Sequence, residues 1–183
     1  AVYMNPKDAA RLGLKPGDFQ IADIRMFRIQ KSMRMEQREM SVYVMSDLHG
    51  EADLFHEMLE RIGFSETDTL YILGDVIDRG PDGIQLLQEI IRTPNMIMLM
   101  GSHEYMMLHH YRDSHNCKMI PNWNQYGNSG TIRAFRNLSI LEQDKILSFL
   151  DSLPSHIRIS LKDKEYYLVH GFPGSTVEDE VRT

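Results

Sequence analysis

Four short apolar runs, each ending directly in a cluster of polar residues, constrain this sequence more than any other feature. The runs are residues 42–45, 70–73, 96–99 and 166–169. Continuous apolar runs of this length are typical of strands that are buried on both faces of a sheet. Segments with helical spacing lie between or after them, at 52–62, 83–91 and 104–111. The alternation predicts a β-α-β layout and therefore an α/β fold.

The flanking segments suggest how the chain is organised. Residues 141–153 carry apolar side chains at helical spacing and stop before Pro154, which predicts a further amphipathic helix. Residues 1–40 precede every polar cluster. Within them we expect a short strand at 19–24, followed by a charged, methionine-rich segment at 25–39. We interpret 1–40 as an N-terminal extension of unassigned role that packs as a strand or arm beside a main domain at 41–183.

Composition narrows the class of protein. A chain of 183 residues with 42% hydrophobic content can bury a substantial core as one domain. Its formal net charge of -6 argues against nucleic acid as a partner, because such binders normally carry a basic stripe. The single cysteine, Cys117, cannot form an internal disulfide, and no apolar run approaches the roughly 20 residues that span a bilayer. We expect a cytoplasmic protein without a membrane partner.

The polar clusters carry residue types that bind metals and phosphate. They are Asp47-Leu48-His49-Gly50, Gly74-Asp75-Val76-Ile77-Asp78-Arg79-Gly80, Gly101-Ser102-His103-Glu104 and His170-Gly171. Ligands of open α/β sheets bind beyond the carboxyl ends of the strands, so we expect the clusters to converge. Asp47 and His49 lie two apart, which puts both on one side of an extended segment and lets them reach one cation. Asp75 has two carboxylate oxygens that can bridge two cations about 3.5–4 Å apart.

Taken in order, these clusters resemble the signature blocks of the calcineurin-like metallophosphoesterases, and among them the phosphoprotein phosphatases. The family's blocks run Asp-x-His-Gly, Gly-Asp-x-x-Asp-Arg-Gly, Gly-Asn-His-Glu and a later His-Gly. Within that family, the blocks resemble those of the small bacterial and lambda-phage-like serine/threonine protein phosphatases. The resemblance covers residues 41–174. It implies a four-layer sandwich of mixed β-sheets flanked by helices, with a metallophosphoesterase domain at 41–183 that lacks its C-terminal part.

The resemblance also implies roles for individual residues. Two divalent metal ions would be held by Asp47, His49, Asp75 and His170, with Asp75 as the bridge; manganese is the first expectation, and iron or zinc are the alternatives. Arg79 would bind the phosphoryl group of the substrate through its planar fork of donors. His103 would be the general acid that protonates the leaving group, and Asp78 would orient it.

The sequence departs from the family pattern at two places. Ser102 stands where the family has a metal-binding asparagine, and a serine hydroxyl is a weaker ligand. The family has a further metal-binding histidine downstream of the His-Gly block, and no histidine follows His170 here. We therefore expect the second metal site to be incomplete, either because the chain is truncated or because it binds one metal well and the other poorly.

Three functions stay open at this point. Hydrolysis of phosphoserine or phosphothreonine in proteins is the first choice, because the block 75–80 has the protein-phosphatase form. Symmetrical dinucleoside tetraphosphatases share most of these residues, so a small phosphate ester of this kind is the enzymatic alternative. A non-catalytic relative that only binds phosphate or a partner is the third hypothesis, motivated by Ser102 and the missing histidine.

Overall fold

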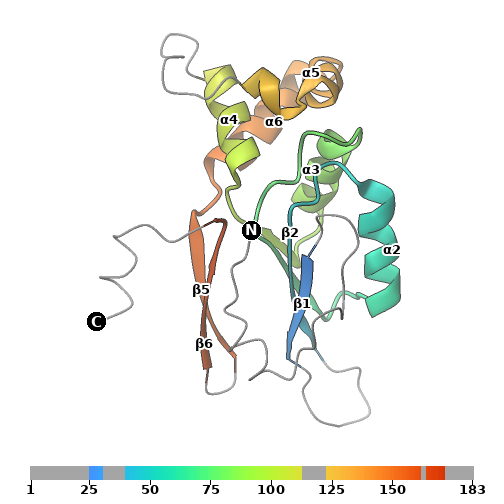
Figure 1. The fold of residues 1–183 in the computed structure, drawn as a ribbon, viewed down its shortest axis with the longest axis vertical. Coiled ribbons are helices and arrows are strands. Elements are labelled where there is room, and N and C mark those ends of the chain that lie inside the picture. The colour runs from blue at the N-terminus through green and yellow to red at the C-terminus, as the bar shows by residue number, and fades with distance from the viewer. Residues whose placement is uncertain (1–24, 31–39, 113–122, 162–163, 172–183) are drawn as a thin grey trace, which may run out of the picture.

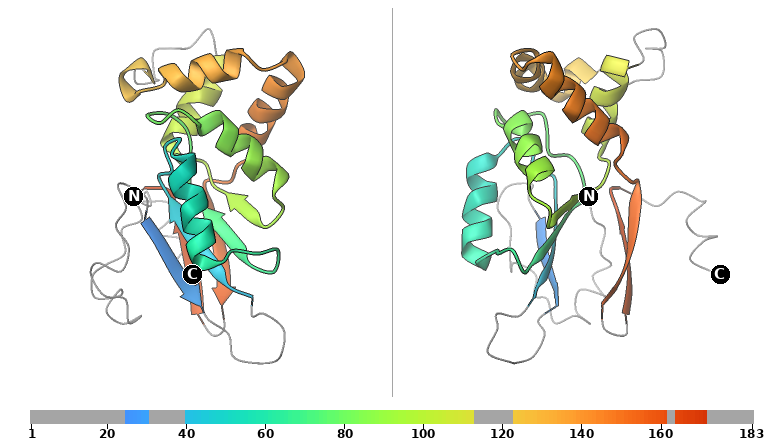
Figure 2. Two further views of the ribbon diagram at one scale, coloured as in Figure 1. Left: turned by 90° about the vertical axis from the view of Figure 1, so that its right-hand side faces the viewer. Right: turned by 180° about the vertical axis from the view of Figure 1, so that it is seen from behind.

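Two β-sheets lie face to face, with helices against the outer face of the larger sheet and a second group of helices beyond its end (Figure 1). This computed structural model describes residues 25–30, 40–112, 123–161 and 164–171, and of 25–30 only the backbone. Figure 2 shows the same layers from two further directions. The sandwich of mixed sheets that the sequence predicts is thereby confirmed.

The larger sheet has the strand order β1-β2-β3-β4. Its strands are β1 (Arg25–Gln30), β2 (Val42–Ser46), β3 (Thr69–Ile72) and β4 (Met96–Met98). Strands β2, β3 and β4 run parallel, and β1 pairs antiparallel with β2 at the edge. Helix α2 (Ala52–Ile62) connects β2 to β3, and helix α3 (Gly83–Arg92) connects β3 to β4. These crossovers bring the carboxyl ends of the parallel strands to one edge.

Both faces of β2 are buried, which explains why its sequence is continuously apolar. Tyr43 and Met45 belong to the core beneath α2 and α3. Val42 and Val44 point the other way, because successive side chains of a strand alternate between faces, and they belong to a second core with Ile159. The second core lies between the two sheets.

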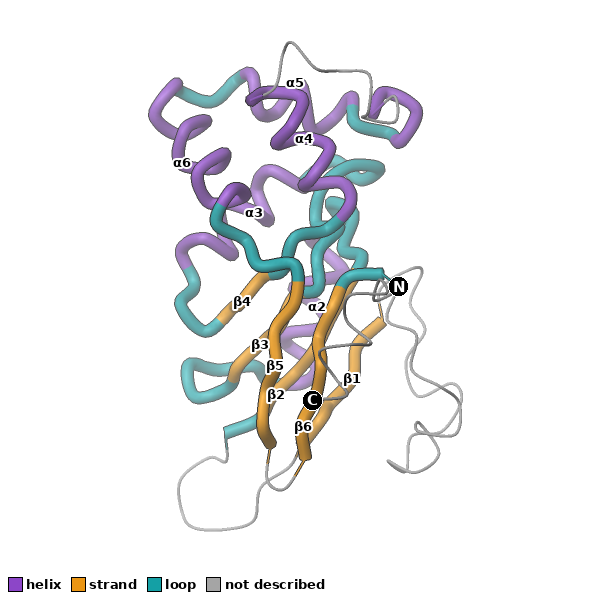
Figure 3. Tube along the Cα trace, turned by 90° about the vertical axis from the view of Figure 1, so that its left-hand side faces the viewer, coloured by secondary structure: helices purple, strands orange, loops and turns teal. Residues whose placement is uncertain are grey.

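The smaller sheet consists of β5 (His156–Leu161) and β6 (Lys164–Val169), paired antiparallel. Figure 3 shows this hairpin in front of the larger sheet. Ile159 and Leu168 join Leu73 and Leu99 in the core between the sheets. In the described ranges, no helix covers the outer face of the hairpin. His170, which follows β6, therefore approaches the ends of β2 and β3 from the second sheet.

Four helical segments gather at the carboxyl end of the parallel strands (Figure 1). They are α4 (Ser102–Arg112), the 3-10 turn η1 (Trp123–Tyr126), α5 (Ser129–Arg136) and α6 (Ile140–Asp151). Helix α4 packs on α6, and α5 packs on α3. None of the described helices is long and apolar enough to cross a membrane.

The elements expected from the sequence at 42–45, 70–73, 96–99, 166–169, 52–62, 83–91, 104–111 and 141–153 all form, with bounds that differ by at most two residues. Four elements were not predicted: β1, which lies in the segment described as a charged extension, the 3-10 turn η1, α5 and β5. The strand expected at 19–24 lies outside the described residues. Because β1 hydrogen-bonds to β2, at least this part of the extension completes the main sheet. The domain boundary at residue 40 stays a prediction.

The start of α6 offers a test of local stability. The Ser139 hydroxyl accepts from the Glu142 amide at 3.3 Å, and the Glu142 carboxylate accepts from the Ser139 amide at 3.0 Å, a reciprocal capping box. We expect Ser139→Ala to lower the free energy of unfolding by about 1 kcal/mol, measured by urea denaturation. Ser148→Ala, within the same helix, is the control and should change it by less than about 0.5 kcal/mol. Equal effects would show that the cap contributes nothing.

Candidate active site

The loop after β2 and the loop after β3 are hydrogen-bonded to each other along their backbones. The amide of His49 donates to Asp75 O at 2.9 Å, and the amide of Gly50 donates to Val76 O at 2.7 Å. In return, the Gly80 amide donates to His49 O at 2.8 Å. A Cβ on Gly50 would stand 2.7 Å from the Gly80 carbonyl carbon, so this close approach requires glycine. Two of the predicted clusters thus form one rigid unit.

This unit holds its functional side chains on a strained backbone. In the described part of the chain, the non-glycine residues with positive φ are Asp47 (60°), His49 (46°), Asp75 (55°), Asp78 (70°) and Arg79 (65°). A residue of this kind costs about 1–3 kcal/mol and persists only where its surroundings over-determine it. All five are residues that the sequence assigned to the site. The strain therefore marks these five site positions independently of the motif.

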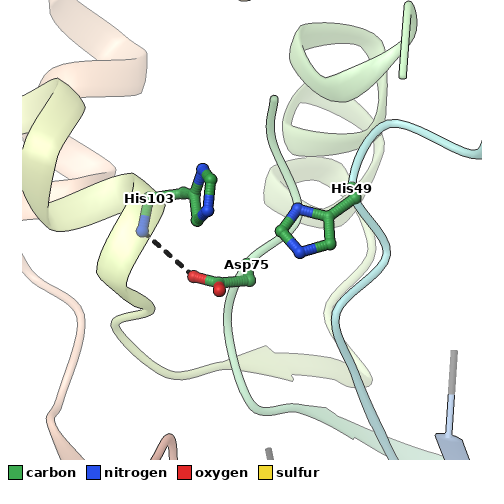
Figure 4. Close-up of side chains that lie close together, drawn as sticks. All are labelled: His49, Asp75 and His103. Atoms are coloured by element: carbon green, nitrogen blue, oxygen red, sulfur yellow. Dashed lines mark hydrogen bonds between the residues drawn. The ribbon is translucent and has the colours of Figure 1, made fainter. Parts of the chain in front are cut away.

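Three of the side chains lie together at the centre of the site (Figure 4). His49, Asp75 and His103 each offer a ligand atom, and these atoms lie within 4.8 Å of one another. All three residues are buried, with exposed fractions of 5%, 5% and 3%. Asp47 reaches the same place, because its Oδ1 lies 3.8 Å from His49 Nε2. His170 arrives from the second sheet, with Nε2 3.4 Å from Asp75 Oδ2.

The three histidines differ in what holds their Nδ1 atoms. His49 Nδ1 lies 3.1 Å from the Ile77 carbonyl oxygen, and His170 Nδ1 lies 2.7 Å from the Leu73 carbonyl oxygen. A carbonyl only accepts, so Nδ1 carries a proton in both residues, and Nε2 is the nitrogen that faces the site. This arrangement is usual for a histidine that ligates a metal. It matches the ligand role predicted for both residues.

His103 is held differently. Its Nδ1 lies 2.7 Å from Asp78 Oδ2, and the same oxygen accepts from Trp123 Nε1 at 2.6 Å. Asp78 is fully buried, so its charge acts at short range without screening by water. A carboxylate partner favours the protonated imidazolium, which is the form that a general acid needs.

The pKa shifts follow these contacts. Burial lowers the pKa of His49, and the positive charges of Arg79 and His103 act in the same direction. Burial also acts to lower the pKa of His103, but the hydrogen bond that its Nδ1 donates to Asp78 and the charge of Asp75 outweigh burial, so that this pKa is raised. The neutral imidazole of a ligand and the charged imidazole of an acid are thus favoured at adjacent positions.

Burial would raise the pKa of Asp75, but hydrogen bonds from His170 and from the His103 amide outweigh it and hold this pKa well below its usual range. The His103 amide donates to Asp75 Oδ1 at 3.0 Å. The Ser102 hydroxyl lies 3.2 Å from each of the two carboxylate oxygens and donates to this group. Asp75 is therefore ionised and bound from several sides. Ser102 supports the carboxylate here, and its role as a weak metal ligand stays a prediction.

Glu104 is a residue of the site to which the sequence analysis assigned no role. It is fully buried, and its carboxylate accepts three backbone hydrogen bonds: from Asp75 at 2.8 Å, Val76 at 2.9 Å and Ile77 at 3.2 Å. Burial and the nearby charge of Asp75 raise the pKa of Glu104 to about 7, while the three amides act against that shift. Glu104 thus fixes the backbone that carries Asp75. The signal in the sequence was its place directly after His103.

The segment from η1 to α5 supports the other side of the site. Thr131 Oγ1 accepts from the Asp78 amide at 3.1 Å, and the Gly127 carbonyl accepts from the Arg79 amide at 3.0 Å. Trp123 is 3% exposed and donates to Asp78. The Tyr126 ring stands 6.0 Å from the His103 ring at 82°. The segment 123–131 therefore packs directly against Asp78, Arg79 and His103.

The donor set fits divalent cations. Asp47, His49, Asp75 and His170 offer two carboxylates and two imidazole nitrogens, the ligand types that suit manganese, iron and zinc. The Nδ1 atoms of both histidines are already engaged with backbone carbonyls, as in metal sites. Arg79 is exposed beside the cluster. Every residue predicted for the site thus lies in this region, and their individual roles stay predictions.

Comparison with known proteins identifies the class. The family model for calcineurin-like phosphoesterases matches residues 40–181. The chain belongs to this family. The ordered motifs predicted this family, whose members use divalent metals.

The curated relatives share a smaller segment. The symmetrical bis(5'-nucleosyl)-tetraphosphatase of Nitrosomonas europaea is 38% identical over 71 residues, which are 38% of this chain and 26% of the relative. The protein of the same name from Acidovorax sp. (strain JS42) is also 38% identical over 71 residues and 25% of its own length. The match therefore spans about a quarter of the length of these relatives.

Solved structures resemble the chain more distantly. A proposed diadenosine tetraphosphatase is 20% identical, with a TM-score of 0.48, over 68% of this chain and 55% of the other. A metallophosphoesterase from Sphaerobacter thermophilus is 19% identical, with a TM-score of 0.44, over 65% and 42%. The family assignment rests instead on the family match and on the order of the motifs.

Gly101 provides a test of how tightly the site is built. A Cβ at this position would stand 2.6 Å from Asp75 Oδ1 and would also collide with Glu104. We expect Gly101→Ala to lower the free energy of unfolding by about 1–3 kcal/mol, because the backbone must shift. We also expect it to remove metal binding by displacing Asp75. Chemical denaturation and calorimetric titration with manganese measure the two effects.

Gly130 is the matched control. A Cβ there would find its nearest neighbour, Gly80 O, at 3.7 Å, and the residue lies within α5. Gly130→Ala should leave metal binding unchanged and raise the free energy of unfolding by about 0.4–1 kcal/mol. If the Gly101 variant binds manganese like the wild type, the close packing around Asp75 is not needed for the site.

Proposed function

We propose that this chain hydrolyses phosphate esters by direct attack of water on phosphorus, and that its substrates are dinucleoside polyphosphates. Hydrolysis of phosphate esters is supported by the different hydrogen-bond partners of the three histidines. His49 and His170 have Nδ1 on backbone carbonyls, as metal ligands do, whereas His103 has Nδ1 on the buried Asp78, as a general acid does. Both features are needed by a metal-dependent phosphoesterase.

Divalent ions held by Asp47, His49, Asp75 and His170 would supply charge neutralisation and a water acidic enough to ionise near neutral pH. Asp75, with oxygens on both sides of its carboxylate, is the residue suited to bridge two such ions. Its bonds from Ser102 and from the His103 amide orient both oxygens. The carboxylate is therefore positioned before any ligand arrives.

The remaining residues act on the substrate. Arg79, exposed at the edge of the site, would hold two phosphoryl oxygens through its planar guanidinium. His103 would donate the proton on Nε2 to the departing oxygen, while Asp78 stabilises the imidazolium until transfer. Water attacks phosphorus, the bond to the leaving oxygen breaks, and no covalent enzyme intermediate is required.

The choice of substrate follows the curated relatives. Those that match this chain carry the name symmetrical bis(5'-nucleosyl)-tetraphosphatase, at 38% identity over a partial segment. This favours the dinucleoside alternative over the phosphoprotein substrate that the block 75–80 suggested first. The exposed Tyr126 beside His103 also offers an aromatic surface where the leaving group emerges.

The catalytic roles predict a dependence on the leaving group. We expect His103→Asn to lower the turnover of phenyl phosphate by about 10²–10⁴-fold, because general acid catalysis supplies about that much. The loss should be smaller for para-nitrophenyl phosphate, whose leaving oxygen needs a proton less. Steady-state kinetics with metal-stripped protein titrated with manganese measures both values.

Asp75→Asn should abolish metal-dependent turnover of both esters, since it removes the shared ligand. His156→Asn, an exposed histidine on β5, is the control and should behave like the wild type. Equal losses with both esters in the His103 variant would contradict the general-acid role. If the wild type turns over neither ester, the Ser102→Asn variant distinguishes an impaired enzyme from a non-catalytic relative. A gain of activity would indicate an impaired enzyme, and no gain would favour a non-catalytic relative.

The substrate class is tested by direct competition. We expect kcat/KM for diadenosine tetraphosphate to exceed that for a phosphoserine peptide by at least about tenfold, a difference of about 1.4 kcal/mol in transition-state binding. Product analysis by chromatography should show ADP alone, as symmetrical cleavage requires. A preference for the phosphopeptide would return the assignment to a serine/threonine protein phosphatase.

A further inference from the structure

A surface cavity on α5 plays no part in the chemistry described so far. It has a volume of about 560 Å³ and is lined by Asn128, Ser129, Ile132, Arg133, Arg136 and Asn137. That volume falls within the range of about 300–1,000 Å³ that is usual for small-molecule sites. Five of the six lining residues are polar, and two of them are cations. The cavity thus has the size of a small-molecule site, and its two arginines suit an anionic molecule.

The cavity lies next to the catalytic region along the chain. Asn128 follows Gly127, whose carbonyl accepts from the Arg79 amide, and Thr131 of the same helix accepts from the Asp78 amide. Helix α5 therefore starts at the phosphoryl-binding edge and leads away from it. Arg133 lies four residues beyond Ser129, a rise of about 6 Å along the helix. A substrate that extends past Arg79 along this helix would reach Arg133 next.

The charge of this helix contrasts with that of the chain. The sequence carries a formal net charge of -6, yet α5 holds two arginines and no acidic residue. Both arginines lie in its last turn, where cations also stabilise the helix dipole. Arg136 additionally lies beside the Tyr111 hydroxyl. Burial raises the pKa of Tyr111, and the charge of Arg136 partly offsets that effect. Arg133 is accordingly the better candidate for contact with a ligand.

From these observations we infer that the α5 cavity is a subsite for the distal phosphates of a nucleoside polyphosphate, with Arg133 as the principal contact. The inference rests on the proposed function and adds to it the residues that select a polyphosphate. A phosphomonoester carries one phosphoryl group, which Arg79 and the metal ligands would already hold. Only a substrate with further phosphates has charge left to place on Arg133.

The kinetic test compares two substrates in Arg133→Gln. We expect KM for diadenosine tetraphosphate to rise about tenfold, since a charge-assisted hydrogen bond is lost. We expect kcat/KM for para-nitrophenyl phosphate to change by less than about twofold. Lys145→Gln on α6 removes one exposed cation elsewhere and should leave both values unchanged. A parallel loss for both substrates, or a loss of thermal stability with no change in KM, would assign Arg133 to the fold and overturn the subsite.

A binding measurement separates this inference from catalysis. Calorimetric titration of the protein with inorganic tripolyphosphate in EDTA should give an affinity that falls about tenfold in Arg133→Gln and not in Lys145→Gln. This outcome would support the subsite even if no ester were hydrolysed. Equal affinities for the wild type and the Arg133 variant, or no binding to the wild type, would overturn it whatever the kinetics show.

Discussion

Hydrogen bonds between the loop after β2 and the loop after β3 are the constraint on which the rest of the site depends. Five non-glycine residues of these loops stand in left-handed conformations, each at a cost of about 1–3 kcal/mol. The amides of His49, Gly50 and Gly80 offset that cost by joining the loops. Glu104 completes the arrangement from α4 by accepting three amides of the second loop. The side chains predicted to bind metal are thereby held in fixed positions, although they lie on loops.

The identity of the atom behind each imidazole then decides what that imidazole can do. A backbone carbonyl behind His49 and His170 holds Nδ1 and leaves Nε2 directed into the site, where it can ligate a metal. A buried carboxylate behind His103 favours a ring that carries a proton. The three histidines have identical side chains, and all three lie around the carboxylate of Asp75. Their differing second partners are enough to separate binding from proton transfer.

Much of this arrangement could be predicted from the sequence, because its signal was local. Apolar runs gave the parallel strands, and polar residues directly after them gave Asp47, His49, Asp75 and His103. What escaped prediction depends on contacts between distant segments. Strand β1 begins the charged, methionine-rich segment 25–39 and forms because β2 offers it a free edge. Helix α5 is short and therefore gives a weak periodic signal. Glu104 and Trp123 stabilise the site through hydrogen bonds to residues that are 27 to 45 positions away in the sequence.

His170 gives the fold a temporal consequence. Its contact with Leu73 joins residues separated by 97 positions and is made from the second sheet. Closing so long a loop costs more chain entropy than forming the neighbouring β-α-β units, and contacts of this kind slow folding. A chain emerging from the ribosome would thus have Asp47, His49 and Asp75 in place well before it could add His170. Docking of the β5–β6 hairpin becomes the step at which the site gains His170.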